Sequence, residues 1–142
     1  MSAISTNASP VAALRQAIRA KVLSDVNFLA ALGGAKFYDE VPRGIEPPYV
    51  VFGDVIDRDW STATDQGSEQ IIRLDVWSTQ RGLLESLTIA GLLATLLQTP
   101  SLQIAGWTLV NFRYQTSETK RDANGRFART SLRYRAVLEK SN

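Results

Sequence analysis

The residues with the clearest chemical potential are two carboxylates, Asp57 and Asp59, which flank Arg58. Paired carboxylates can act as general acid and general base, and they can hold a metal ion. The neighbouring sequence supplies no nucleophile and no calcium-loop spacing, and the chain has no cysteine and no histidine. Those two absences exclude disulfides, thiolate chemistry, zinc–sulfur sites and a histidine base. We therefore interpret the cluster as a solvated run of charges and expect no enzyme activity.

A second chemical pattern is a row of arginines near the C-terminus, Arg129, Arg133 and Arg135. Odd-numbered positions of one strand share a face, so the three side chains are expected on the side away from the core. Two interpretations stay open. The arginines are solvated and paired with acids such as Asp75, or they form a basic surface that contacts nucleic acid. A net charge of +2 does not favour nucleic acid by itself.

The third pattern is the long polar segment Asp57–Glu69, which carries one large aromatic residue, Trp60. A hairpin needs only about two to five connecting residues, so this segment is unusually long. Long polar loops are usually solvated, but an exposed tryptophan is a typical anchor of protein interfaces. We therefore predict that the first part of the segment contacts another protein subunit. The residues concerned are Asp57, Arg58, Asp59, Trp60, Ser61 and Thr62.

Strands on both sides must position this segment. Residues 49–56 are rich in β-branched and aromatic side chains, and residues 70–78 alternate between apolar and polar ones, which predicts an antiparallel hairpin. Two more strands are predicted over residues 107–114 and 129–139, joined by a charged loop at 117–126. The side chains expected to share a face in these two strands are Val110, Phe112 and Tyr114, and then Leu132, Tyr134, Ala136 and Leu138.

Three helices accompany the strands. Ser9 and Pro10 begin an amphipathic helix that ends near Ser24, and Asp25 caps a short second helix that Gly33 closes. A third helix, over about residues 81–98, is apolar nearly all round, so it is expected to be covered on more than one side. One cover is the sheet. The other is the N-terminal helix or a neighbouring subunit.

Together these elements predict an α+β fold: an antiparallel four-stranded sheet with helices packed on one face and a long central hairpin loop. A short edge strand over residues 36–41 and a proline-rich connector at 42–48 precede the hairpin. With 142 residues the chain suits one domain, expected over residues 10–139 after a flexible N-terminus at 1–9. We recognise no signal peptide and no membrane span, so synthesis in the cytoplasm is expected.

Several short runs occur in an order and spacing that resemble a known family. The runs are Tyr38–Pro42, Pro47–Val51, Asp59–Thr62, Leu74–Ser78, Glu118–Arg126 and Leu132–Ala136. The opening Leu14-Arg15 helix and the turn at Leu29–Gly34 match as well. The chain resembles, over about residues 10–139, the tail terminator or tail completion proteins of tailed phages and phage-like gene transfer agents.

The resemblance implies a structural protein of a virion or phage-like particle, assembled in the host cytoplasm. Such proteins form rings, usually hexamers, that cap the tail tube, end its polymerisation and join it to the head-neck connector. The implied partners are further copies of the chain, the tail tube protein, the connector protein and DNA passing through the ring, which would face Arg129, Arg133 and Arg135. No cofactor, metal or membrane is implied. Alternatives are another neck or head-completion subunit and a small DNA-binding module.

Overall fold

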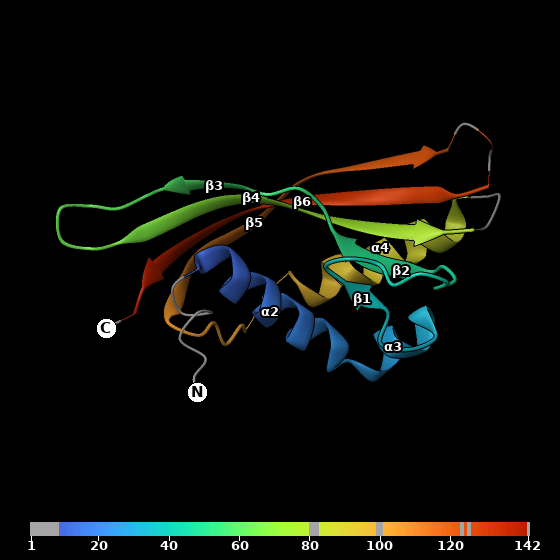
Figure 1. The fold of residues 1–142 in the computed structure, drawn as a ribbon, viewed down its shortest axis with the longest axis horizontal. Coiled ribbons are helices and arrows are strands. Elements are labelled where there is room, and N and C mark those ends of the chain that lie inside the picture. Colours follow the sequence, from blue (N-terminus) through green and yellow to red (C-terminus); the bar gives the residue numbers. More distant parts are fainter. Residues whose placement is uncertain (1–8, 80–82, 99–100, 123, 125, 142) are drawn as a thin grey trace.

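In the computed structural model, one layer of the molecule is a twisted sheet and the other is made of helices (Figure 1). The structure describes residues 9–79, 83–98, 101–122, 124 and 126–141. The described helices are α2 (Pro10–Leu23), α3 (Val26–Leu32) and α4 (Leu84–Leu96). The described strands are β1 (Phe37–Tyr38), β2 (Tyr49–Phe52), β3 (Ile56–Asp59), β4 (Gly67–Ser78), β5 (Trp107–Arg121) and β6 (Ala128–Lys140). None of the described helices is long and apolar enough to cross a membrane.

The first two helices begin and end where their capping residues predict. The backbone N–H of Ala12 donates to Oγ of Ser9 at 3.1 Å, and that of Phe28 donates to Oδ2 of Asp25 at 2.9 Å. Gly33 ends α3 with φ of +78°, a left-handed conformation that glycine adopts without strain. Both predictions are confirmed. The flexible N-terminus expected at residues 1–9 lies outside the described residues except for Ser9.

The sheet is mixed, with the strand order β1-β2-β4-β6-β5, and β3 pairs with the first part of β4. The α+β class and the helix layer on one face are confirmed, but the antiparallel four-stranded sheet is wrong. Among the described residues the sheet has six strands, and β1 runs parallel to β2. The parallel pair forms because the proline-rich connector carries the chain back to the end of the sheet where β1 started.

One expected strand, residues 49–56, is divided at Gly53 into β2 and β3. NH2 of Arg15 donates to the carbonyl oxygen of Gly53 at 2.8 Å, which draws that carbonyl toward α2. The guanidinium of Arg73 lies over the same glycine, so close that an added Cβ would be 2.4 Å from its Nε. Both strands still pair antiparallel with β4, so they act as two halves of one interrupted strand.

The predicted loop Asp57–Glu69 is wrong at both ends. Residues 57–59 belong to β3 and residues 67–69 to β4, so the connection is only residues 60–66. Polar side chains hid this extension from the sequence pattern, because ladder hydrogen bonds join backbone groups and do not require apolar neighbours. The β3–β4 hairpin projects beyond the helices at the left of Figure 1. We call residues 56–71 the arm and residues 59–66 the arm tip.

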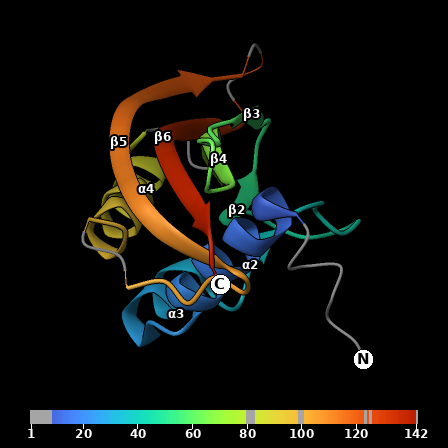
Figure 2. The ribbon, with the colours of Figure 1, turned by 90° about the vertical axis from the view of Figure 1, so that its left-hand side faces the viewer.

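Strand β5 is longer and less regular than predicted. It continues to Arg121, so the first half of the expected loop at 117–126 is strand. Register shifts lie between Leu109 and Asn111 and between Tyr114 and Thr116. Such bulges bend a strand and reverse its facing pattern, and the resulting curvature of β5 is plain in Figure 2. The prediction that Val110 shares a face with Phe112 is therefore wrong. Val110 is 56% exposed, while Phe112 packs against the core.

The core fills the space between the sheet and the helices. The expected inward residues Leu132, Tyr134, Ala136 and Leu138 are all buried, as are Ile72, Leu74 and Val76 of β4. In α4, one side is buried through Ile89, Ala90 and Leu93. The helix also contacts α2 and α3, as the predicted cover by the N-terminal helix requires. Its opposite side is left open by the described residues: Leu84 is 74% exposed, Leu87 47% and Leu92 37%. The start expected near residue 81 lies outside the described residues.

Candidate functional site

The sheet face away from the helices, here called the outer face, collects most of the residues singled out in the sequence. Cross-strand pairing places Arg73 opposite Arg133 and Asp75 opposite Ser131. It also places Trp77 opposite Arg129 and Ile71 opposite Arg135. The predicted outward orientation of the arginine row follows from the same alternation that buries Leu132 and Tyr134.

A four-residue cluster, the Trp60 clamp, fastens the arm to this face. The carboxylate of Glu69 lies between two arginines: Nε of Arg135 donates to its Oε2 at 2.6 Å, and NH2 of Arg58 donates to its Oε1. Both guanidinium groups lie 5.4 Å from the centre of the Trp60 ring. Trp60 is 46% exposed, so it rests on the arginines and leaves one side open.

The clamp perturbs the acid at its centre. The hydrogen bond from Arg135 lowers the pKa of the Glu69 carboxyl, burial opposes that change, and Arg58 lowers the pKa further. Glu69 is only 8% exposed, although the sequence suggested the solvated end of a loop. Its role was missed because nothing in the sequence indicates that positions 58, 69 and 135 meet.

The residues predicted as an interface are partly brought together. Arg58 and Trp60 meet in the clamp, whereas Asp57 accepts a hydrogen bond from Oγ of Ser68 at 2.6 Å. Oδ1 of Asp59 accepts from N of Ser61 at 3.2 Å and from its Oγ. Asp57 and Asp59 thus serve local hydrogen bonds, and Ser61 and Thr62 lie in the exposed arm tip.

The arginine row is divided among three environments. Arg135 is held by Glu69, Arg129 lies 5.5 Å from the centre of the Trp77 ring, and Arg133 is exposed. Asp75, the expected acidic partner, instead forms its ion pair with Arg73 at 3.0 Å and accepts a hydrogen bond from Ser131 at 2.7 Å. Within the described chain, neither Arg129 nor Arg133 has an ion pair.

The two unpaired arginines share a small groove that sequence reasoning missed. Its volume is about 110 Å³, and its lining residues are Arg73, Thr116, Glu118, Arg129, Ser131 and Arg133. Three strands contribute to it, so only the sheet register assembles it. We call it the basic groove. Its size and charge suit small anionic groups such as carboxylate or phosphate.

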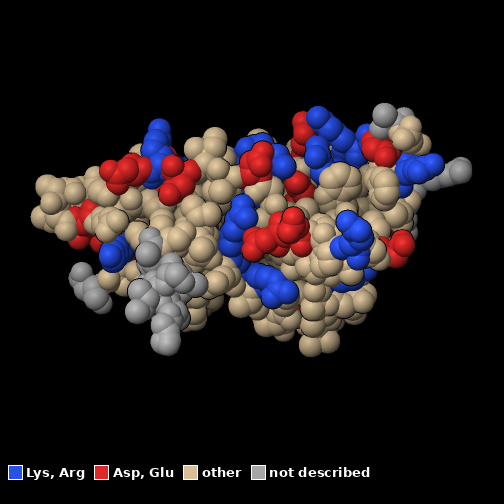
Figure 3. Space-filling view, viewed as in Figure 1, with Lys and Arg blue, Asp and Glu red and all other residues tan. Residues whose placement is uncertain are grey.

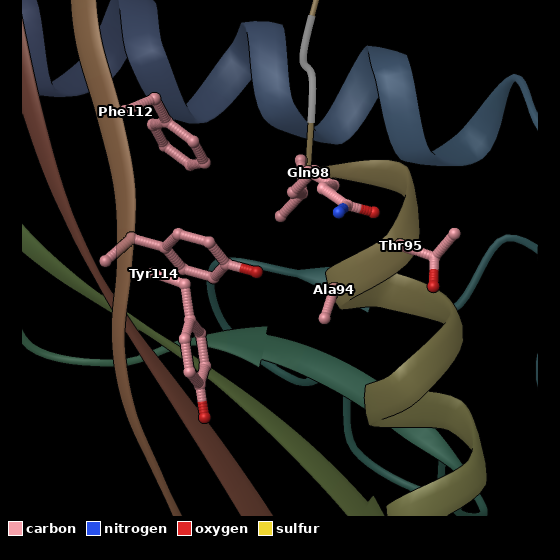
Figure 4. Close-up of a pocket in the computed structure, with 7 residues that line it drawn as sticks. Ala94, Thr95, Gln98, Phe112 and Tyr114 are labelled. Carbon is pink, nitrogen blue, oxygen red and sulfur yellow. The ribbon is translucent and has the colours of Figure 1, made fainter.

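A second cavity lies between the end of α4 and β5 (Figure 4). It has a volume of about 300 Å³ and is lined by Ala94, Thr95, Leu97, Gln98, Phe112, Tyr114 and Tyr134. Phe112 stacks on Tyr134 with ring centres 4.8 Å apart, and Tyr114 meets Tyr134 edge-on at 5.7 Å. Burial, with a smaller effect of Tyr114, raises the pKa of Tyr134 to about 12. The tyrosine therefore stays neutral, and the cavity lining carries no charged side chain.

These features define an α+β protein with three distinctive surface features: a projecting arm, a basic groove and an exposed leucine face. Among the described residues, no group of histidine, cysteine, aspartate and glutamate is arranged to hold a metal ion. The sequence matches the tail completion protein gp17 family over residues 16–139, so the chain belongs to that family. The family resemblance is confirmed, and the chain is a component of the tail region of a virion or phage-like particle.

Solved structures show the same fold. A chain in the virion of a native gene transfer agent (GTA) particle aligns with a TM-score of 0.84 and 24% sequence identity. The alignment covers 91% of this chain and 96% of that chain, so the likeness extends over the whole fold. A search of curated protein sequences gives no match.

Proposed function

We propose that this protein is the subunit of a ring, most simply of six copies, that caps the tail tube and ends its polymerisation. The same ring joins the tail to the connector of the head. Membership of the tail completion family supports this role, as does the occurrence of the same fold in a GTA virion. Closed rings are built from head-to-tail contacts, in which two different surfaces of the subunit meet.

The observation that carries the proposal is the uncovered face of α4. Leu84, Leu87 and Leu92 expose much of their surface on one side of a helix. The only charged residue of that helix is Glu85, whose Oε1 accepts a hydrogen bond from Ser78. An exposed apolar helix face with no charge is typical of a surface that is buried on assembly. We assign a neighbouring subunit as its cover.

A second candidate function is a direct contact with DNA in the lumen of the ring. Arg129 and Arg133 favour it, because within the described chain neither has a carboxylate partner. Arg135 no longer belongs to this candidate surface, since its guanidinium is committed to Glu69 and Trp60.

The test combines oligomeric state with imaging. The purified protein is expected to sediment as a closed multimer of the 15.6 kDa chain, and one ring should appear at the head-proximal end of each tail. A double variant, Leu84→Gln with Leu87→Gln, should lose assembly while its melting temperature changes little. Val26→Gln is the matched control, because Val26 is 77% exposed on another helix. A strictly monomeric wild-type protein that never enters particles would refute the proposal.

A further inference from the structure

The two ends of the sheet differ in charge. The arm end carries the exposed acids Asp57, Asp59, Asp65 and Glu139. Its cations include Lys140, which is exposed, and Arg58, which is paired with Glu69. The other end carries Lys120, Arg121, Arg126, Arg129 and Arg133 around the β5–β6 turn. In Figure 3 acidic side chains are the more frequent near the arm and lysine and arginine the more frequent at the other end, although each end carries both signs of charge. A molecule whose two ends carry an opposite excess of charge is suited to head-to-tail association.

Among the described residues that line it, the basic groove has three arginines and one acid, Glu118, so positive charge is in excess. Arg73 is opposite Arg133 in the strand pairing, and like charges in directly opposed positions repel. Asp75 compensates Arg73 at 3.0 Å, and Glu118 is 3.5 Å from Lys120. The charges of Arg129 and Arg133 are thus left over, and an anion entering the groove relieves the repulsion.

The arm tip presents carboxylates in a preformed loop. N of Trp60 donates to the carbonyl of Gly67 at 3.0 Å, and N of Thr62 donates to that of Asp65 at 2.8 Å. N of Asp65 donates in turn to Oγ1 of Thr62 at 3.0 Å. Among the described residues neither Asp59 nor Asp65 forms an ion pair, and both are exposed. A loop ordered in advance loses little conformational entropy on binding.

The tip cannot reach the groove of its own chain. Asp65 and Arg73 are eight positions apart along an extended strand, a separation of roughly 25 Å at about 3.3 Å per residue. The acceptor of the tip is therefore a different molecule. The exposed tip carries acidic side chains and the groove is lined by three arginines, so the groove of a second copy is an acceptor of complementary charge.

We propose that the arm tip of one copy enters the basic groove of the next copy, with Asp59 and Asp65 contacting Arg129 and Arg133. This contact rests on the proposed ring function and supplies one of its head-to-tail interfaces. A subunit in a closed ring has a neighbour on each side. The groove lies on the sheet layer, and the leucine face of α4 lies on the helix layer. The two surfaces can therefore contact neighbouring subunits at the same time.

Charge reversal tests the contact. One variant carries Asp59→Lys and Asp65→Lys, and a second carries Arg129→Glu and Arg133→Glu. Like charges then face each other at every interface, and the concentration needed for half-maximal ring formation should rise at least about tenfold. A third variant with all four changes restores opposite charges and should assemble nearly as well as wild type. Glu40→Lys with Glu46→Lys, at exposed positions before β2, alters the net charge by as much as the tip variant and is the control for altered charge alone.

The outcomes separate this contact from the ring proposal itself. Circular dichroism and melting curves first establish that each variant is folded. If wild type forms rings and both two-site variants assemble equally well, the contact is wrong while the ring function stands. If wild type forms no rings, the proposed function fails. If the arginine variant still forms rings but loses a salt-sensitive affinity for DNA, the groove binds DNA and the arm contact is overturned.

Discussion

Nε of Arg135 lies 2.6 Å from Oε2 of Glu69, although 66 positions separate the two residues. The sequence placed the arginine in a surface row and the acid in a solvated loop. Their pairing joins β4 to β6 on the outer face, and both belong to the clamp on which Trp60 rests. The arm is thereby held to the sheet through the contacts of Arg135 with Glu69 and Trp60.

Trp60→Ala should loosen the arm without unfolding the domain. Each of the two cation–π contacts at an exposed site contributes about 0.5–1 kcal/mol, so a loss of about 1–2 kcal/mol is expected. For a domain of this size that corresponds to a fall in melting temperature of a few °C, measurable by calorimetry. Limited proteolysis should cut faster within residues 56–71. An unchanged melting curve and unchanged cleavage would show that the clamp adds no stability.

Glu69→Gln should remove a pH-dependent contribution to stability. Because the folded-state pKa of Glu69 is lowered, ionisation stabilises the fold above the ordinary glutamate pKa of about 4.3. That contribution disappears as pH falls through the lowered folded value. The variant should therefore melt below wild type near neutral pH, and the two melting temperatures should converge in acid. The control is Glu139→Gln, at an exposed position without an ion pair among the described residues. A difference in melting temperature between Glu69→Gln and wild type that grows toward low pH would contradict the prediction.

Gly53→Ala should be costly only while Arg73 is present. The new Cβ would meet Nε of Arg73 at 2.4 Å and displace a guanidinium that pairs with the buried Asp75. In an Arg73→Ala background that clash is absent, so the second change should cost little more. A double-mutant cycle by urea denaturation should give a coupling energy of about 0.5–3 kcal/mol. Strict additivity of the two free-energy changes would show that the glycine is not required by this contact.

Two identical changes in α4 should have unlike effects. Leu93 is fully buried, and Leu93→Ala should cost about 2–5 kcal/mol of unfolding free energy, as truncation of core leucines usually does. Leu84 is 74% exposed, and Leu84→Ala should stay within about 0.5 kcal/mol. Chemical denaturation of the two variants measures the difference. Similar losses in both would mean that the outward side of α4 is covered within the subunit.

Much of this molecule was determined locally by the sequence. The capping residues Ser9 and Asp25 start helices at the expected positions, and period-two alternation identifies the buried side chains of β4 and β6. These features depend on neighbours within a few positions, which a single sequence displays directly. The α+β class follows from the order of such elements.

Only the tertiary structure decided which charges are free. Glu69 and Arg135 neutralise each other, Asp75 pairs with Arg73, and Arg129 and Arg133 form no ion pair among the described residues. The bulges in β5 and the extension of the arm were equally invisible in the side-chain pattern. The physical reason is that strand register is set by backbone hydrogen bonds between distant segments. A shift of one residue moves every side chain to the other face and changes which ion pairs can form.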